Sequence, residues 1–379
     1  MTLGVVSLNC AGQDAAPGAE QRRTAIALEQ RGENADAEVA WRAVLKADPA
    51  SAEAYAHLGL LEARQARYAD AVAFYRRALA LEPEMPGLRL NLGLSLFKSG
   101  ELKAAAETFT PLLRSLPASS PDVQRVTVLI GMSYYGLGEY AEAIPYLKDA
   151  AGRDAQSLEL RLTLAHSCMQ AKQFSCVLDV YHQILLLNAE SAEADMLAGE
   201  ALEEMRDDPG AIQQFQAAVK ANPKEPNVHF GLGYLLWKLK RYPEAADQFQ
   251  AELANVPDHV YALAYLADAK IQMQDNDAAL PLLQEAIRLD PKMELAHVDL
   301  ATLDAEAHRQ QEAVRELTLA AGLHPEDASV HWKLARLYQA MGKTREARAE
   351  IEKTRNLHRA EDATVFHQLS EAQAEQASK

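Results

Sequence analysis

Prolines recur along this chain at a fixed spacing of 34 residues. Pro49, Pro83 and Pro117 form one series, and a second series consists of Pro223, Pro257, Pro291 and Pro325. The step from Pro117 to Pro223 is three periods plus four residues, which indicates a single insertion. We place this insertion at Ser120–Val123, where turn-forming residues cluster. A period of this length predicts an array of stacked structural repeats.

Residues 226–259 show what one repeat contains. Two amphipathic segments are separated by a short break at Lys240–Tyr242. Pro243 lies in the first turn of the second segment, where a helix tolerates proline. Pro257 follows that segment, because proline cannot continue a helix. The repeat is therefore predicted to be a helix–turn–helix hairpin, which needs similar neighbours to bury its apolar faces.

Ten such repeats fit the chain, at 18–51, 52–85, 86–119, 124–157, 158–191, 192–225, 226–259, 260–293, 294–327 and 328–361. Position 8 is Gly or Ala in every repeat, and position 20 is Ala in all but one. Position 24 is large: Trp41, Tyr75, Phe109, Leu147, Tyr181, Phe215, Phe249, Leu283, Leu317 and Ile351. Small residues at 8 and 20 let two helices approach closely, and the large residue fills the space beside them.

At these positions the sequence resembles the tetratricopeptide repeat family, which has 34-residue helical hairpins. The resemblance implies an all-α fold, a right-handed α-solenoid of ten 34-residue helix–turn–helix repeats, with the first helix of each hairpin lining the concave face. Repeat 158–191 departs most, with Val177 at position 20 and Ala189 in place of the proline. We expect residues 362–379 to form a C-terminal capping helix and tail. Residues 1–17 are either a disordered leader or the remnant of a secretory signal.

The length, net charge and apolar runs of the chain exclude several classes of protein. A chain of 379 residues is too long for one globular core. Its net charge of −16 argues against a nucleic-acid-binding protein, which needs clustered Lys and Arg. No apolar run is long enough for a membrane-spanning helix. The compartment stays open: cytoplasmic, or exported and periplasmic if the N-terminus is a truncated signal.

The sequence predicts no enzyme. It has no phosphate-binding glycine loop, no nucleophile elbow and no His-Glu-x-x-His motif. The histidines are scattered, and no cysteine pair has metal-ligand spacing. We therefore predict no catalytic, cofactor-binding or metal-binding residues, and no cofactor.

Cys168 and Cys176 lie at positions 11 and 19 of the same hairpin, near its turn. One interpretation is a disulfide that staples this loosely matching repeat, provided that the compartment is oxidising. The alternative is two buried thiols that act as small apolar residues.

One side of the first helices is not needed for hairpin packing. We call positions 2, 5, 9 and 12 of each first helix the first-helix face; in the family this side lines the groove. It carries apolar and aromatic residues, which are enriched in interface cores. The candidate partner-binding residues are Leu60, Leu94, Phe97, Met132, Tyr135, Glu200, Glu203, Phe230, Tyr234, Trp237 and Tyr261. The alternative is that several of them pack against neighbouring repeats.

These observations favour a non-catalytic scaffold for protein–protein interaction. An apolar segment of a protein or peptide partner would lie along the first-helix face, and Glu200 and Glu203 would suit basic residues in it. The alternative is a structural or self-assembling solenoid in a larger complex, possibly of the cell envelope.

Overall fold

The structure is a computed structural model that describes residues 18–187 and 191–377, and over these ranges its regular elements are 20 α-helices. The predicted leader, residues 1–17, lies outside the described residues. The chain divides into two compact units, Met1–Ala189 and Glu190–Lys379. We call them the N-terminal and C-terminal units and describe each by itself. In the described part of the chain, no helix combines the length and apolarity that a bilayer crossing requires.

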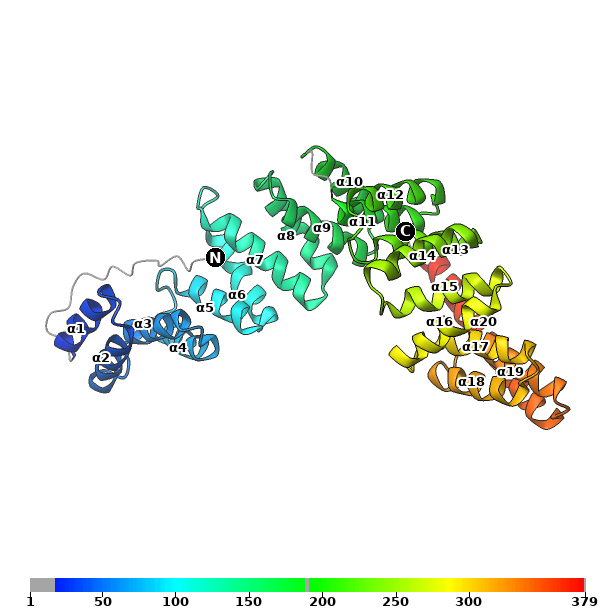
Figure 1. Cartoon of the computed structure of the whole chain (residues 1–379). Coiled ribbons are helices and arrows are strands. Elements are labelled where there is room, and N and C mark those ends of the chain that lie inside the picture. Colours follow the sequence, from blue (N-terminus) through cyan, green and yellow to red (C-terminus); the bar gives the residue numbers. More distant parts are fainter. Residues whose placement is uncertain (1–17, 188–190, 378–379) are drawn as a thin grey trace. The chain divides into compact units, whose positions relative to one another are not determined.

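The N-terminal unit is built from ten helices that follow one another along the chain (Figure 1). They are α1 (Ala19–Gln30), α2 (Asn34–Ala47), α3 (Ala52–Arg64), α4 (Tyr68–Leu81), α5 (Leu88–Ser99), α6 (Leu102–Ser115), α7 (Asp122–Leu137), α8 (Tyr140–Arg153), α9 (Leu158–Gln170) and α10 (Phe174–Leu185).

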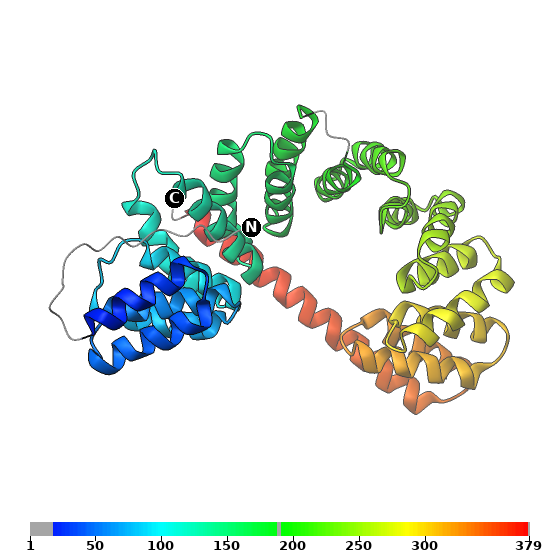
Figure 2. The same cartoon turned by 60° about the vertical axis from the view of Figure 1, so that its left-hand side comes forward.

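The C-terminal unit has the same construction (Figure 2). Its helices are α11 (Ala192–Glu204), α12 (Asp208–Ala221), α13 (Val228–Lys238), α14 (Tyr242–Asn255), α15 (Val260–Gln272), α16 (Asn276–Leu289), α17 (Glu294–Glu306), α18 (Gln310–Leu323), α19 (Ala328–Ala340) and α20 (Thr344–Ala377).

Consecutive helices pack side by side within each unit, and contacts rarely reach beyond the next hairpin. This is the arrangement of an α-solenoid, as the periodicity predicts. Each expected 34-residue repeat contains two helices, and α14 begins at Tyr242 with Pro243 in its first turn, which confirms that prediction. The repeat boundaries themselves stay a prediction.

In the five repeats with glycine at position 8, that glycine packs against the side chain at position 24. A Cβ atom added to Gly93 would lie 2.4 Å from the Phe109 ring, and one added to Gly59 would lie 2.7 Å from the Tyr75 ring. The residue at position 24 is buried in eight of the ten repeats. In repeat 158–191 Tyr181 is only half-buried, while Val180 and Ile184 on the same helix are buried instead. This repeat therefore packs its second helix differently, in keeping with its weaker sequence match.

The turn between the two helices has the same backbone conformation in every repeat. Its residue at position 15 has a positive φ, in the left-handed region, at Gly32, Ala66, Gly100, Gly138, Lys172, Arg206, Lys240, Gln274, His308 and Gly342. The next residue donates its N–H to the carbonyl five residues back, for example Arg67 to Glu62 and Glu101 to Leu96. This pattern is the Schellman motif, which satisfies carbonyls at the end of the first helix.

Two expectations about irregular segments need correction. The insertion placed at Ser120–Val123 is partly helical, because α7 begins at Asp122 and buries Val123. An acidic residue in the first turn favours this earlier start. Residues 362–377 form no separate capping helix, because α20 continues as a single helix from Thr344 to Ala377 (Figure 2). The sequence offers no Gly or Pro after Lys343 that would end it.

The left-handed turn gives a matched pair of predictions. Ala66→Gly should stabilise the protein by up to about 1 kcal/mol. Alanine is sterically strained at the φ of 58° found there, and glycine is not. Gly100→Ala should destabilise it by about the same amount. No atom lies within 4 Å of an added Cβ at Gly100, so backbone strain alone acts there. Urea denaturation measures both changes, and shifts of the same sign would contradict the argument.

A second prediction concerns the close contact between Gly93 and Phe109. Gly93→Ala should destabilise the hairpin by about 1–3 kcal/mol, because the added methyl group overlaps the ring. Adding Phe109→Leu should recover part of that loss, since a smaller side chain leaves room for the methyl group. A double-mutant cycle measures this coupling. Additive effects of the two substitutions would show that the ring does not limit position 8.

Candidate protein-binding surface

The candidate residues of the N-terminal unit differ in accessibility. Leu60, Phe97, Met132 and Tyr135 are half-buried. Leu94 is only 7% exposed and belongs to the core formed by α3 to α7, so we leave it out of the candidate surface. Phe97 packs against the same core. The first-helix face of this unit is therefore apolar, but neighbouring hairpins already cover much of it.

The candidate residues of the C-terminal unit form a cluster of stacked rings. Phe230 lies 6.1 Å from Tyr234, and Tyr234 lies 6.0 Å from Trp237, measured between ring centroids. Tyr265 of α15 lies against all three, at 6.0, 5.2 and 4.9 Å respectively. Tyr261, also on α15, lies 6.4 Å from Phe230. We call these five residues the aromatic cluster.

The aromatic cluster corrects one part of the sequence interpretation. Phe230, Tyr234 and Trp237 are half-buried, and Phe230 also contacts Phe249 of the hairpin core at 5.8 Å. They therefore help to join α13 to α15, and the fold uses them in part. Tyr265 was missed because it lies at position 6, outside the positions we had assigned to the first-helix face. Its spacing of four residues from Tyr261 was the available signal.

Polar groups fix the edges of this cluster. The Trp237 indole Nε1–H donates to Asp268 Oδ2, and Gln272 Nε2 donates to Asp268 Oδ1 at 3.3 Å. Burial, followed by the nearby Tyr234, raises the pKa of Tyr265 to about 12. Asp268 was also missed, although it lies on the first-helix face at position 9.

One ion pair ties the cluster to the preceding repeat. Lys238 Nζ donates to Glu203 Oε1 at 2.6 Å and lies 5.8 Å from the centre of the Tyr234 ring. The hydrogen bond to Glu203, more than any other influence, raises the pKa of Lys238. Glu203 is thus already partnered within the chain, and Glu200 is half-buried. Tyr261 is the most open member of the cluster, with 57% of its surface exposed.

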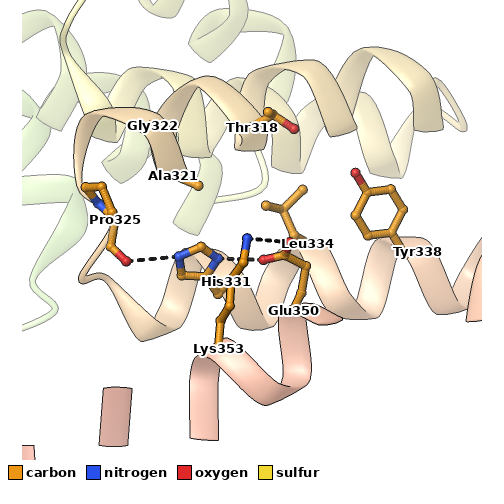
Figure 3. A pocket seen from close by; sticks show the side chains of 9 residues that line it. All are labelled: Thr318, Ala321, Gly322, Pro325, His331, Leu334, Tyr338, Glu350 and Lys353. Atoms are coloured by element: carbon orange, nitrogen blue, oxygen red, sulfur yellow. Dashed lines mark hydrogen bonds and ion pairs between the residues drawn. The ribbon is translucent and has the colours of Figure 1, made fainter. Parts of the chain in front are cut away.

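A histidine pattern that the sequence analysis overlooked links successive repeats. His297 and His331 both occupy position 4, and each is 4% exposed. His331 Nδ1 lies 2.6 Å from Glu350 Oε2, and its Nε2 lies 3.0 Å from the Pro325 carbonyl oxygen (Figure 3). Both contacts are within hydrogen-bond distance, so the ring bridges two successive repeats.

The same pattern occurs one repeat earlier. His297 contacts Glu316 at 2.7 Å and the Pro291 carbonyl at 3.0 Å. The available signal was the spacing, because each histidine, glutamate and proline recurs after 34 residues. A pocket of about 330 Å³ lies beside His331, between α18, α19 and α20 (Figure 3). Its charged side chains, Glu350 and Lys353, bond to each other at 2.9 Å, so this region serves as a structural contact.

The two cysteines meet across the turn of repeat 158–191. The structure joins Cys168 of α9 to Cys176 of α10 by a disulfide, with their Cα atoms 5.8 Å apart. This separation lies in the usual range for disulfides. Whether the protein keeps the bond depends on its compartment, so the disulfide stays a prediction.

The hairpin array and its side-chain pattern define a helical repeat protein, and comparison with known families identifies which one. One tetratricopeptide repeat model matches residues 22–86, 178–226, 196–260 and 266–328, and a second matches residues 60–127 and 134–201. Together these ranges cover most of the chain, so the chain belongs to the tetratricopeptide repeat family. Proteins of this family generally mediate protein–protein interactions and are generally non-catalytic.

Individual relatives are distant. The chain is 22% identical over 285 residues to anaphase-promoting complex subunit 3 of Schizosaccharomyces pombe, covering 66% of this chain and 42% of the relative. It is 21% identical over 239 residues to the peroxisomal targeting signal receptor of Kluyveromyces lactis, covering 61% and 42%. The chain thus spans less than half the length of both proteins.

A solved structure supports the fold. A tetratricopeptide repeat protein from Parabacteroides merdae matches with a TM-score of 0.50 at 17% identity, covering 66% of this chain and 97% of that one. At this identity the likeness bears on the fold alone.

The Glu350 contacts predict a pH effect on stability. Burial is the largest single influence and raises the pKa, but hydrogen bonds from Lys353 and His331 outweigh it and hold the pKa of Glu350 below 4.5. The unfolded chain therefore binds more protons just below pH 4.5, and stability falls there as the pH decreases. Glu350→Gln should flatten this part of the stability curve. Glu352→Gln, an exposed site on the same helix, should leave it unchanged when both are measured by urea denaturation.

The disulfide gives a separate prediction. In protein purified without reductant, peptide mass mapping should recover the segments around Cys168 and Cys176 as one linked species. Replacing both with serine should lower stability by about 2 kcal/mol, because the bond restricts the unfolded chain. Reductant should lower the stability of the wild-type protein equally. Free thiols at both positions in protein from its own compartment would contradict the prediction.

Proposed function

We propose that this protein is a non-catalytic scaffold whose C-terminal unit binds an apolar segment of a partner protein. The aromatic cluster around Tyr261 carries the proposal. Its rings lie on first helices, and in this family first helices line the binding groove. Tyr261 is among the most exposed large hydrophobic residues in the described part of the chain. Exposed aromatic residues beside rigid, packed neighbours are typical centres of protein interfaces.

The four less exposed rings of the aromatic cluster form a rigid surface beside Tyr261. Phe230, Tyr234, Trp237 and Tyr265 hold one another at centroid distances of 4.9 to 6.1 Å, so little side-chain freedom is lost when a partner binds. The Lys238–Glu203 pair lies at the edge of the cluster, where polar groups surround an interface core. Binding to a segment of another protein is consistent with the relative that is named a peroxisomal targeting signal receptor.

The packing of the aromatic cluster decides which substitution tests this proposal. Replacing Phe230, Tyr234 and Trp237 together would remove packing between α13 and α15, so loss of binding would not be distinct from unfolding. Tyr261→Ala removes an exposed ring and should leave the fold intact. Leu319→Ala is the matched control, since Leu319 is 54% exposed and lies on α18, a second helix.

We expect a random peptide library displayed on phage to yield binders rich in aromatic and large aliphatic residues when selected on the wild-type protein. Fluorescence anisotropy with the selected peptides should show that Tyr261→Ala weakens binding about tenfold or more. Leu319→Ala should leave binding unchanged. If no peptide is enriched, or if both variants bind as the wild-type protein does, the proposal fails.

A further inference from the structure

The exposed side of α19 carries two positive charges that form no ion pair within the described part of the chain. Lys333 and Arg336 are exposed, and within the described residues neither side chain makes an ion pair or a hydrogen bond. Trp332 lies beside them with 49% of its surface exposed. Most exposed cations elsewhere in this unit that contact a carboxylate do so on a neighbouring turn, as Arg288 does with Glu285. The α19 group is therefore open to an external partner.

These residues continue the surface that holds the aromatic cluster. Trp332 and Arg336 follow Phe230 and Tyr234 by three 34-residue periods each, so they occupy positions 5 and 9 of their repeat. Equivalent positions in stacked repeats lie on the same side of the array. Lys333 directly follows Trp332 in the sequence and occupies position 6 of the same repeat. The face of the C-terminal unit thus runs from the aromatic cluster on α13 and α15 to cationic side chains on α19.

The buried carboxyl group of Asp299 does not pair with these side chains. Asp299 of α17 interacts electrostatically with Lys333, but it is only 6% exposed and its Oδ2 has no hydrogen-bond partner. Burial first, and then the charge of Asp268, raises the pKa of Asp299 well above its ordinary value. Within the described residues Asp299 makes no ion pair with Lys333 or Arg336, and both of these side chains stay exposed.

We propose that Trp332, Lys333 and Arg336 bind an acidic stretch of the same partner segment whose apolar part contacts the aromatic cluster. This inference rests on the proposed function and adds the chemistry of the second contact. The ammonium group of Lys333 and the guanidinium group of Arg336 attract Asp or Glu side chains. The indole of Trp332 covers the aliphatic or aromatic residue next to them. The partner segment therefore carries an apolar anchor and an acidic group, in that order along the face from α13 to α19.

The distance between the two contacts sets the spacing in the partner. The exposed anchor, Tyr261, lies on α15, two steps along the row of first helices from α19. Packed helices lie about 8–10 Å apart, so the two contacts are about 20 Å apart. An extended chain advances about 3.3 Å per residue, so the acidic residues should follow or precede the apolar anchor by about six residues.

The experiment selects random peptides of about 16 residues, displayed on phage, on the wild-type protein. The selected sequences should be enriched in Asp and Glu at about six residues from an aromatic or large aliphatic residue. Synthetic versions should bind the Lys333→Glu/Arg336→Glu protein about tenfold more weakly than the wild-type protein, and raised salt should reduce the difference. Lys333→Gln/Arg336→Gln should show an intermediate loss, since it removes charge without adding repulsion.

The matched control is Arg345→Glu/Arg348→Glu. These two exposed arginines lie on α20 and make the same change in net charge away from the first-helix face. Unchanged binding in this variant excludes a general effect of net charge. Peptides with apolar anchors but no acidic residues, bound equally well by the Lys333→Glu/Arg336→Glu protein, would overturn this inference and leave the proposed function standing. Failure to select any peptide would overturn both.

Discussion

The contact between a small residue at position 8 and a large one at position 24 is the interaction on which the array depends. With Gly93 against Phe109, an added methyl group would lie 2.4 Å from the ring, so the first helix approaches as closely as its backbone allows. A buried ring in this position contributes on the order of 2 kcal/mol by burial alone. The large side chain at position 24 is buried in eight of the ten hairpins, so the packing of the two helices is largely set inside each hairpin. Stacking then has only to join one hairpin to the next.

Stacking itself uses contacts of a different kind. His297 and His331 each link a glutamate of their own repeat to a proline carbonyl of the repeat before, and they do so while buried. Each buried ring contacts both oxygens within hydrogen-bond distance, so these contacts favour one distance between neighbouring repeats. The proline at position 32 consequently has two effects. It ends one helix, and its carbonyl receives a hydrogen bond from the next repeat.

The sequence predicted the packing inside each hairpin and missed contacts that join one hairpin to the next. The hairpins, the turn before Tyr242 and the buried positions recur every 34 residues, so errors at one repeat were corrected by the others. Tyr265 and Asp268 contact Trp237 of the preceding repeat, and these contacts depend on how far each hairpin rotates relative to the next. No single-repeat pattern encodes that rotation. The prediction divided the helix that begins at Thr344 into a hairpin helix and a separate cap. The helix continues because no Gly or Pro follows Lys343 to end it.

The core of each hairpin constrains positions 8, 20 and 24 and leaves the first-helix face free to vary from repeat to repeat. That freedom explains why the two units differ there: mixed aliphatic and aromatic side chains on the N-terminal unit, and a ring cluster followed by cations on the C-terminal unit. An unpaired Lys333 and Arg336 beside an exposed Trp332 add nothing to hairpin packing. Some residues of a repeat array depart from the common pattern without destabilising the core. Selection for binding can act on such residues. The α19 surface has that property more clearly than the aromatic cluster, whose inner rings also serve the fold.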